Sequence, residues 1–79
     1  MDAATVKALL QDHLPDCEFY VQGEGSNYDI VAVGAVFEGL RPVKKQQLVY
    51  GALAGEIAGG AIHAVNIRTH TPEEWQAQS

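Results

Sequence analysis

Glycine and proline divide this chain of 79 residues into six short segments. The interruptions fall at Pro15, at the turn-forming stretch 23–27, at Pro42, at Gly59-Gly60 and at Pro72. Glycine supplies backbone conformations that other residues avoid, and proline does not continue a helix or a central strand. The chain can therefore form only short helices and strands, and its length fits one small domain, residues 1–79.

The first and last segments have helical patterns. Val6, Leu9, Leu10 and Leu14 recur at spacings of three and four, which predicts a helix that ends near Pro15. Residues 71–75 read TPEEW, in which a threonine and a glutamate have the spacing of a capping box and the proline suits the first helical position. We therefore expect a short C-terminal helix that carries the tryptophan.

The segment that begins at Pro42 is predicted to form the longest helix, ending at Gly59-Gly60. The positions along its predicted apolar face are Val43, Gln47, Tyr50, Leu53 or Ala54, and Ile57. Three glycines, Gly51, Gly55 and Gly59, share one stripe of this helix, although each costs about 1 kcal/mol relative to alanine. We infer that another part of the fold approaches this stripe closely.

Three segments, 18–22, 28–36 and 62–69, are predicted to be strands, and the first two form a hairpin. The resulting order, αββαβα, is that of a two-layer α+β domain with helices on one face of a three-stranded sheet. The second and third strands should be parallel, because a helix joins them. Their first residues then lie at the same edge, which brings His63 close to the turn 23–27.

Composition excludes several classes of protein. The single cysteine, Cys17, cannot form an internal disulfide and leaves too few thiols for a structural zinc site. The longest apolar run, residues 30–37, is far shorter than the roughly 20 residues of a membrane helix. No nucleophile with a positioned base is evident, so we expect no enzyme. We expect a cytoplasmic protein that is a monomer or weak homodimer by itself.

Charge is distributed unevenly along the chain, whose net charge is -5. Arg41, Lys44 and Lys45 lie between Gly39 and Gly55 without any acidic residue, whereas the other segments carry two basic and ten acidic side chains. Such a basic patch favours an anionic partner, either nucleic acid or an acidic protein face, but solvated surface cations explain it equally well.

His63 is the one histidine with polar neighbours that would suit a metal. His70, seven residues further along the same strand, would lie about 23 Å away, too far to share an ion. A lone strand histidine is more often a half-buried structural residue than a ligand. If His63 does bind a metal, the remaining ligands must come from another molecule.

Four stretches of the sequence carry a family resemblance. They are GEGSNYDIVAVG (23–34), FEGLRPVKKQQLVY (37–50), IHAV (62–65) and TPEEW (71–75). Together they closely resemble the BolA family, and most of all its bacterial IbaG branch. The resemblance covers essentially the whole chain.

The resemblance implies a class II KH-like α+β fold with a three-stranded mixed sheet. It also implies binding to a monothiol glutaredoxin and a 2Fe-2S cluster shared with that partner and its glutathione. His63 would be the cluster ligand of this chain. In the family a second ligand, a Cys or His, often comes from the turn. Here Glu24 and Asn27 are the turn candidates, but IbaG relatives commonly have histidine where this chain has Asn27, and asparagine is a poor iron ligand. The alternatives are a solvent species, another histidine, or binding to glutaredoxin without a tightly held cluster.

Members of the family are also described as transcriptional regulators. In that alternative, Arg41, Lys44 and Lys45 would contact DNA. The two functions differ in the residues they need, and they are not mutually exclusive. A third reading is a docking domain that has no cofactor.

Overall fold

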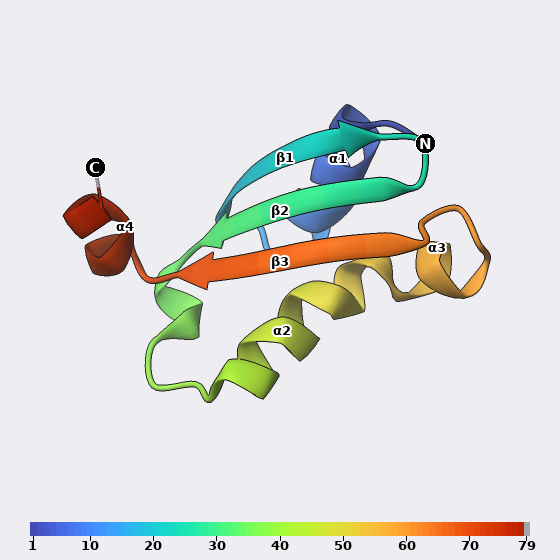
Figure 1. Cartoon of the computed structure of the whole chain (residues 1–79). Helices are drawn as coiled ribbons and strands as arrows, with labels where there is room; N and C mark the ends of the chain where they lie inside the picture. The colour runs from blue at the N-terminus through green and yellow to red at the C-terminus, as the bar shows by residue number, and fades with distance from the viewer. Residues whose placement is uncertain (79) are drawn as a thin grey trace.

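The computed structural model describes residues 1–78, and Figure 1 shows the arrangement of its elements. In chain order these are α1 (Ala3–His13), β1 (Glu18–Glu24), β2 (Asn27–Val33), the 3₁₀ turn η1 (Ala35–Phe37), α2 (Pro42–Tyr50), the 3₁₀ turn η2 (Gly51–Leu53), α3 (Ala54–Ala58), β3 (Ala64–His70) and α4 (Pro72–Gln78). The predicted order of helices and strands is confirmed, but the second of the three predicted helices is divided into α2, η2 and α3.

The three strands form one mixed sheet in the order β1-β2-β3. The hairpin strands β1 and β2 are antiparallel, and β2 pairs in parallel with β3. The parallel register places Asn27 beside Ala64, at the first residues of both strands. The sheet therefore brings the hairpin turn and the start of β3 to the same end of the strands, as predicted.

Alternation along the strands gives the sheet one buried face. Phe19, Tyr28 and Ile30 are at most 2% exposed, and they pack with core residues of α1, α2 and η2. The core from these helical segments consists of Val6, Leu10, Val49 and Leu53. The two-layer α+β prediction is therefore confirmed for α1, α2 and η2.

The C-terminal helix α4 packs elsewhere, at one end of the opposite face. Its Trp75 stacks on Tyr20 with ring centroids 5.3 Å apart, and Tyr20 points away from its buried neighbour Phe19. The predicted capping box is confirmed: Thr71 N–H donates to Glu74 Oε1 at 2.7 Å, and Glu74 N–H donates to Thr71 Oγ1 at 3.2 Å.

The hairpin turn is tighter than its sequence suggests. β1 continues to Glu24 and β2 begins at Asn27, so only Gly25 and Ser26 connect the strands. Gly25 has a φ of +67°, which glycine adopts without a steric penalty. At the other end, β2 stops at Val33 rather than Val36, and the chain turns into η1.

The predicted long helix from Pro42 to Ile57 is broken at Gly51, which makes the 11-residue α1 the longest helix of the described chain. The break lies where α1 comes close: a Cβ at Gly51 would be 3.5 Å from His13 Nε2. Gly55 faces open space, and the atom nearest a Cβ at Gly59 is the Gly55 carbonyl oxygen. The predicted close approach of another element is thus correct for Gly51 and wrong for the rest of the stripe.

The orientation of α2 also differs from its predicted apolar face. Val43 is 58% exposed and Tyr50 43% exposed, and Gln47 is exposed between them. Leu53, which belongs to the predicted face, is fully buried, and Ile57 packs partly buried against the core. The buried partner of Leu53 one turn earlier is Val49, which the predicted face leaves out. Both stripes fit the helical period, and the stripe with Val49 is the one that faces the sheet. An apolar stripe of α2 is consequently left in solvent.

A side chain of α2 makes a hydrogen bond to the backbone of β3, which is an edge strand of the sheet. Gln46 Nε2 donates a 2.8 Å hydrogen bond to the Ile67 carbonyl oxygen. The strand begins at Ala64, two residues later than predicted, and Ile62 before it is 1% exposed in the core. Across residues 1–78, no helix combines the length and apolar character of a membrane span.

Candidate functional site

His63 lies in the loop between α3 and β3, one residue before the strand. Its backbone N–H donates to the Ser26 carbonyl oxygen at 2.8 Å, and the N–H of Ala64 donates to the same oxygen at 3.2 Å. Two hydrogen bonds on one acceptor fasten the start of β3 to the tip of the hairpin. The predicted proximity of His63 to the turn is therefore confirmed.

The His63 side chain is exposed, and among residues 1–78 it has no hydrogen-bond partner. The neighbouring Gly60 has a φ of +85°, and a Cβ there would lie 4.0 Å from His63 Nε2. A Cβ at this position would therefore reach only ordinary van der Waals contact with the ring. Both imidazole nitrogens are thus available to an external group, since neither is used within the fold.

Glu24 and Asn27 close the hairpin beside His63. They face each other across the two-residue turn, and Asn27 pairs with Ala64 in the parallel register. Both residues are exposed. The structure therefore brings all three sequence-predicted ligand candidates to one edge of the sheet.

The buried side chain of Tyr28 stabilises this turn, a role that was not apparent from the sequence. Its side chain is 2% exposed, and its hydroxyl lies 2.7 Å from the Gly25 carbonyl oxygen and 2.8 Å from that of Met1. The single hydroxyl proton is shared between these two acceptors. An aromatic residue just after a glycine-containing turn was the only available signal in the sequence.

These side chains offer a metal ion the imidazole of His63 and the carboxylate of Glu24, and the amide of Asn27 has a low affinity for iron. Within the described chain, 1–78, no group of three or more His, Cys, Asp or Glu side chains could hold a metal ion. A four-coordinate iron of a 2Fe-2S cluster needs further ligands, commonly thiolates. These side chains thus fit part of a shared site and do not make up a complete one.

Cys17 lies at the opposite end of the sheet. It precedes Glu18, which pairs with Val33, whereas the His63 end of β2 is Asn27. The thiol is buried against Gly34, and burial raises its pKa, with a further upward contribution from Asp16. A protonated, enclosed thiol is a poor metal ligand, so the residue has a packing role.

The two other histidines lie on other elements or at the other end of the sheet. His13 is in the last turn of α1, beside Gly51. His70 ends β3 next to Val33, where Gln78 Nε2 lies 3.0 Å from its Nδ1 and the Trp75 ring packs on it. The sequence-based separation of His63 from His70 is consistent with this placement.

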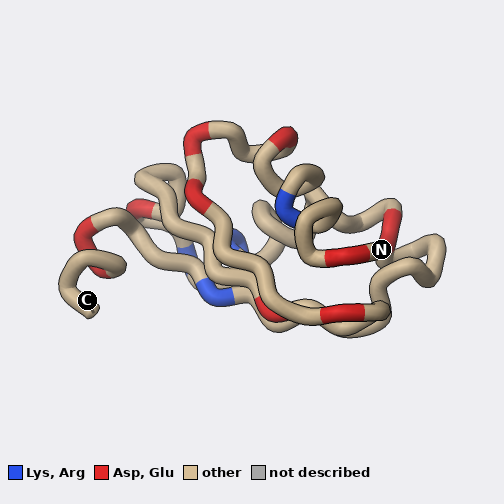
Figure 2. Tube along the Cα trace, turned by 90° about the horizontal axis from the view of Figure 1, so that it is seen from above, with Lys and Arg blue, Asp and Glu red and all other residues tan. Residues whose placement is uncertain are grey.

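The basic patch, Arg41, Lys44 and Lys45, lies at the start of α2, beyond the end of β2 that is opposite His63 (Figure 1). The pKa of Glu74 on α4 is lowered mainly by its hydrogen bond from the Thr71 N–H, with a smaller contribution from Lys45 of this patch. Figure 2 shows acidic positions around most of the outline of the molecule and few basic ones. The two sets of sequence-predicted functional residues thus occupy different ends of the protein.

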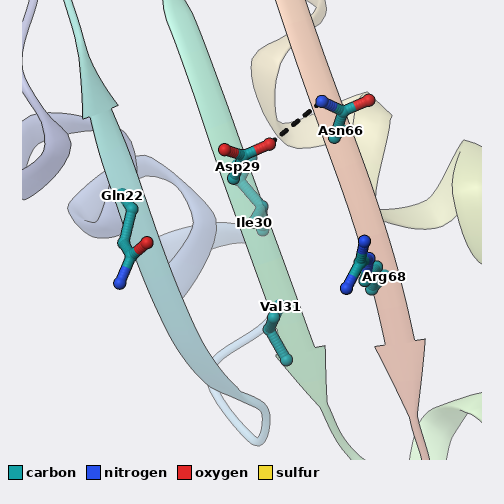
Figure 3. A pocket seen from close by; sticks show the side chains of 6 residues that line it. All are labelled: Gln22, Asp29, Ile30, Val31, Asn66 and Arg68. Carbon is teal, nitrogen blue, oxygen red and sulfur yellow. Dashed lines mark hydrogen bonds between the residues drawn. The ribbon is translucent and has the colours of Figure 1, made fainter.

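A shallow pocket of about 280 Å³ lies on the open face of the sheet (Figure 3). Its lining side chains come from all three strands, and Asn66 Nδ2 donates to Asp29 Oδ1 at 3.0 Å across it. Arg68 also lines this pocket and has no ion-pair partner among residues 1–78. Alternation in β3 predicts that Asn66 and Arg68 share a face, but the pocket itself depends on strand pairing.

The site and fold can be compared with known proteins. Residues 5–74 match the family described as BolA-like protein. The chain belongs to the BolA family. It is 44% identical over 75 residues to the acid stress protein IbaG of Escherichia coli K12, a match that spans 95% of this chain and 89% of that protein. This similarity places the chain in the IbaG branch of the BolA proteins.

Solved structures of BolA proteins share the fold. A bolA protein homologue from Coxiella burnetii superposes with a TM-score of 0.84 at 27% identity, covering 96% of this chain and 97% of that chain. Yeast Fra2 superposes with a TM-score of 0.76 at 25% identity, covering 95% and 84%. The predicted BolA-like fold is therefore confirmed.

Proposed function

We propose that this BolA-family chain is a non-enzymatic adaptor that binds a monothiol glutaredoxin and shares a 2Fe-2S cluster with it. His63 supplies one ligand of the cluster from this chain. The glutaredoxin cysteine and a glutathione thiol supply ligands on the other side. The cluster is cargo that the two proteins hold together.

The observation that supports this proposal is the state of the His63 side chain. The ring is exposed and unbonded within the described residues, while its backbone is fastened to Ser26. The backbone of such a ligand is already ordered, and its ring does not have to break an internal hydrogen bond before it binds. An imidazole in place of a thiolate also raises the potential of a 2Fe-2S cluster, which suits a cluster that is passed on.

On this chain's side of the cluster, the second ligand is either Glu24 or an external species. Glu24 lies on the same turn and is exposed, and its carboxylate is a hard oxygen ligand. Asn27 occupies the adjacent position with a neutral amide. We therefore expect His63 to contribute more to cluster binding than either turn residue.

Reconstitution tests this function directly. The protein is mixed with a monothiol glutaredoxin, iron, sulfide and glutathione, and the visible absorption and circular dichroism spectra are compared with those of the glutaredoxin homodimer. We expect a heterodimer with a distinct spectrum. His63→Ala should abolish that spectrum, and Glu24→Gln should leave most of it.

The matched control is His13→Ala, which removes another exposed imidazole, in the last turn of α1. It should leave the spectrum unchanged. The same spectrum and cluster stability for His63→Ala and the unaltered protein would exclude His63 as the ligand. A heterodimer that forms without any cluster signal would support the cofactor-free docking domain instead.

DNA binding through Arg41, Lys44 and Lys45 is the second candidate. Arg41 and Lys44 are exposed and have no ion-pair partner among residues 1–78. Lys44→Ala combined with Lys45→Ala should weaken duplex binding and lower its salt slope by roughly two. Unchanged duplex retardation by that double variant at physiological salt would remove this candidate.

A further inference from the structure

We propose that the outer side of α2 is a docking surface for an acidic protein segment that carries apolar side chains. This α2 surface consists of Leu40, Arg41, Val43, Lys44, Gln47 and Leu48. It is a different surface from the His63 edge, and it does not depend on cluster binding there. The proposal goes beyond the glutaredoxin partnership, because it gives the protein a second protein partner.

The apolar part of the α2 surface combines an exposed side chain with an open groove. Val43 is 58% exposed, the largest value among the exposed large apolar side chains of residues 1–78. Beside it, Leu40, Lys44, Gln47 and Leu48 line an open groove of about 360 Å³. The helix buries Val49 on its other side, so no described element of this chain covers the groove. Exposed apolar grooves of this kind are typical of protein interfaces.

The charged part of the α2 surface selects the partner. Arg41 and Lys44 are exposed cations without an ion-pair partner among residues 1–78. They stand on a chain of net charge -5, so the patch is positive in a negative surrounding. An acidic partner is attracted to this patch and repelled by most of the remaining surface, which orients its approach.

The combination favours a protein segment over nucleic acid. Val43 lies between Arg41 and Lys44 in the sequence, and Leu48 is one helical turn beyond Lys44. A phosphate backbone offers anions but nothing apolar to cover these side chains. An amphipathic segment with Leu and Glu side chains satisfies both requirements at once.

The position of the α2 surface lets both ends of the protein be occupied together. Arg41 follows the end of β2 opposite to Asn27, and β2 spans residues 27–33, about 20 Å at 3.3 Å per residue. A partner whose contacts are limited to the turn and His63 leaves the start of α2 accessible. The surface therefore suits a second protein bound in the same complex.

A synthetic peptide tests this surface. The probe is a fluorescein-labelled amphipathic helix with leucine at helical spacing on one face and glutamate at the flanking positions. Two matched peptides replace either all leucines by serine or all glutamates by glutamine. We expect saturable binding of the probe by fluorescence anisotropy, with amide shifts concentrated in residues 40–50, and much weaker binding of both matched peptides.

Three variants sharpen the test. Val43→Ser should weaken probe binding about tenfold, because an apolar contact is lost. Lys44→Glu should weaken it about five- to tenfold, and Lys7→Glu on α1 makes the same change of net charge without effect. All three positions are exposed, so the circular dichroism spectra of these variants should match that of the unaltered protein.

Several results would overturn the proposal. Equal binding of the serine peptide would mean that the surface recognises charge alone. Duplex DNA that displaces the probe while Val43→Ser has no effect would assign the surface to nucleic acid. His63→Ala must leave probe binding intact, so failure of the cluster adaptor and failure of this surface are separable. Displacement of the probe by glutaredoxin would show that glutaredoxin itself occupies the α2 surface, which leaves no place for a second partner.

Discussion

The His63 amide donates a 2.8 Å hydrogen bond to the Ser26 carbonyl oxygen, and this bond links the candidate ligand to the tip of a hairpin far away in sequence. The position of His63 therefore depends on the conformation of the Gly25-Ser26 turn. Anything that loosens the turn also loosens His63, even when the histidine itself is intact.

Tyr28→Phe tests this dependence. The substitution removes a buried hydroxyl that donates a shared hydrogen bond to the carbonyl oxygens of Gly25 and Met1. We expect the free energy of unfolding in urea to fall by about 1 kcal/mol. Amide exchange at His63 should accelerate as the turn loosens. Tyr50→Phe, at an exposed tyrosine, is the control and should change neither quantity.

Two glycines of neighbouring segments should respond in opposite directions to alanine. Gly60 has a φ of +85°, so Gly60→Ala should lower the free energy of unfolding by about 1 kcal/mol. Gly55 lies in α3, and a Cβ there meets nothing within 4 Å, so Gly55→Ala should raise stability by about 0.5–1 kcal/mol. Urea denaturation measures both, and the same sign for the two would contradict the described backbone.

The contact between Gly34 and Cys17 predicts a coupled pair. A Cβ at Gly34 would lie 2.5 Å from Cys17 Sγ, so Gly34→Ala should destabilise the protein by about 1–3 kcal/mol. Adding Cys17→Ala makes room for the new methyl group. The double variant should therefore lose less stability than the sum of the single variants. Strict additivity in a denaturation series would show that the two positions do not touch.

The capping box of α4 predicts a pH response. The hydrogen bond from Thr71 N–H holds the pKa of Glu74 below its usual value of 4.5, and Lys45 and His70 lower it further. Because the folded state has the lower pKa, the cap contributes stability above pH 4.5 and loses it as the pH falls through the folded pKa. Fluorescence of the single tryptophan, Trp75, should report loosening of α4 in this acid range.

Two variants separate the cap from other acid effects. Glu74→Gln should remove this part of the Trp75 response. Glu73→Gln changes the adjacent carboxylate, which has no part in the cap, and should retain the response. An identical acid titration for Glu74→Gln and the unaltered protein would place the transition at another group.

The sequence predicts well those features that local chemistry determines. Thr71 and Glu74 form their capping box because both partners lie within one helical turn. His63 could be placed near the turn because a helix between two strands implies parallel pairing, which aligns their first residues. The order of elements followed from the same short-range signals.

Features that depend on packing could not be predicted. Val43 and Val49 both belong to stripes with helical spacing, and only the position of the sheet decides that Val49 is buried. The contact between Gly51 and His13 joins two segments that are distant in the sequence. At the candidate site, the support from Tyr28 involves the start of the chain, 27 residues away, which no local pattern reveals.

The hydrogen bond from Gln46 to Ile67 has a consequence for how this sheet can grow. A free strand edge offers its backbone to any extended chain, and such pairing leads to aggregation or strand addition. Because Gln46 occupies an outward carbonyl of β3, that edge is a poor template. The other edge strand of the sheet is β1, where Glu18 and Glu24 stand at the two ends and repel an acidic chain that would add there.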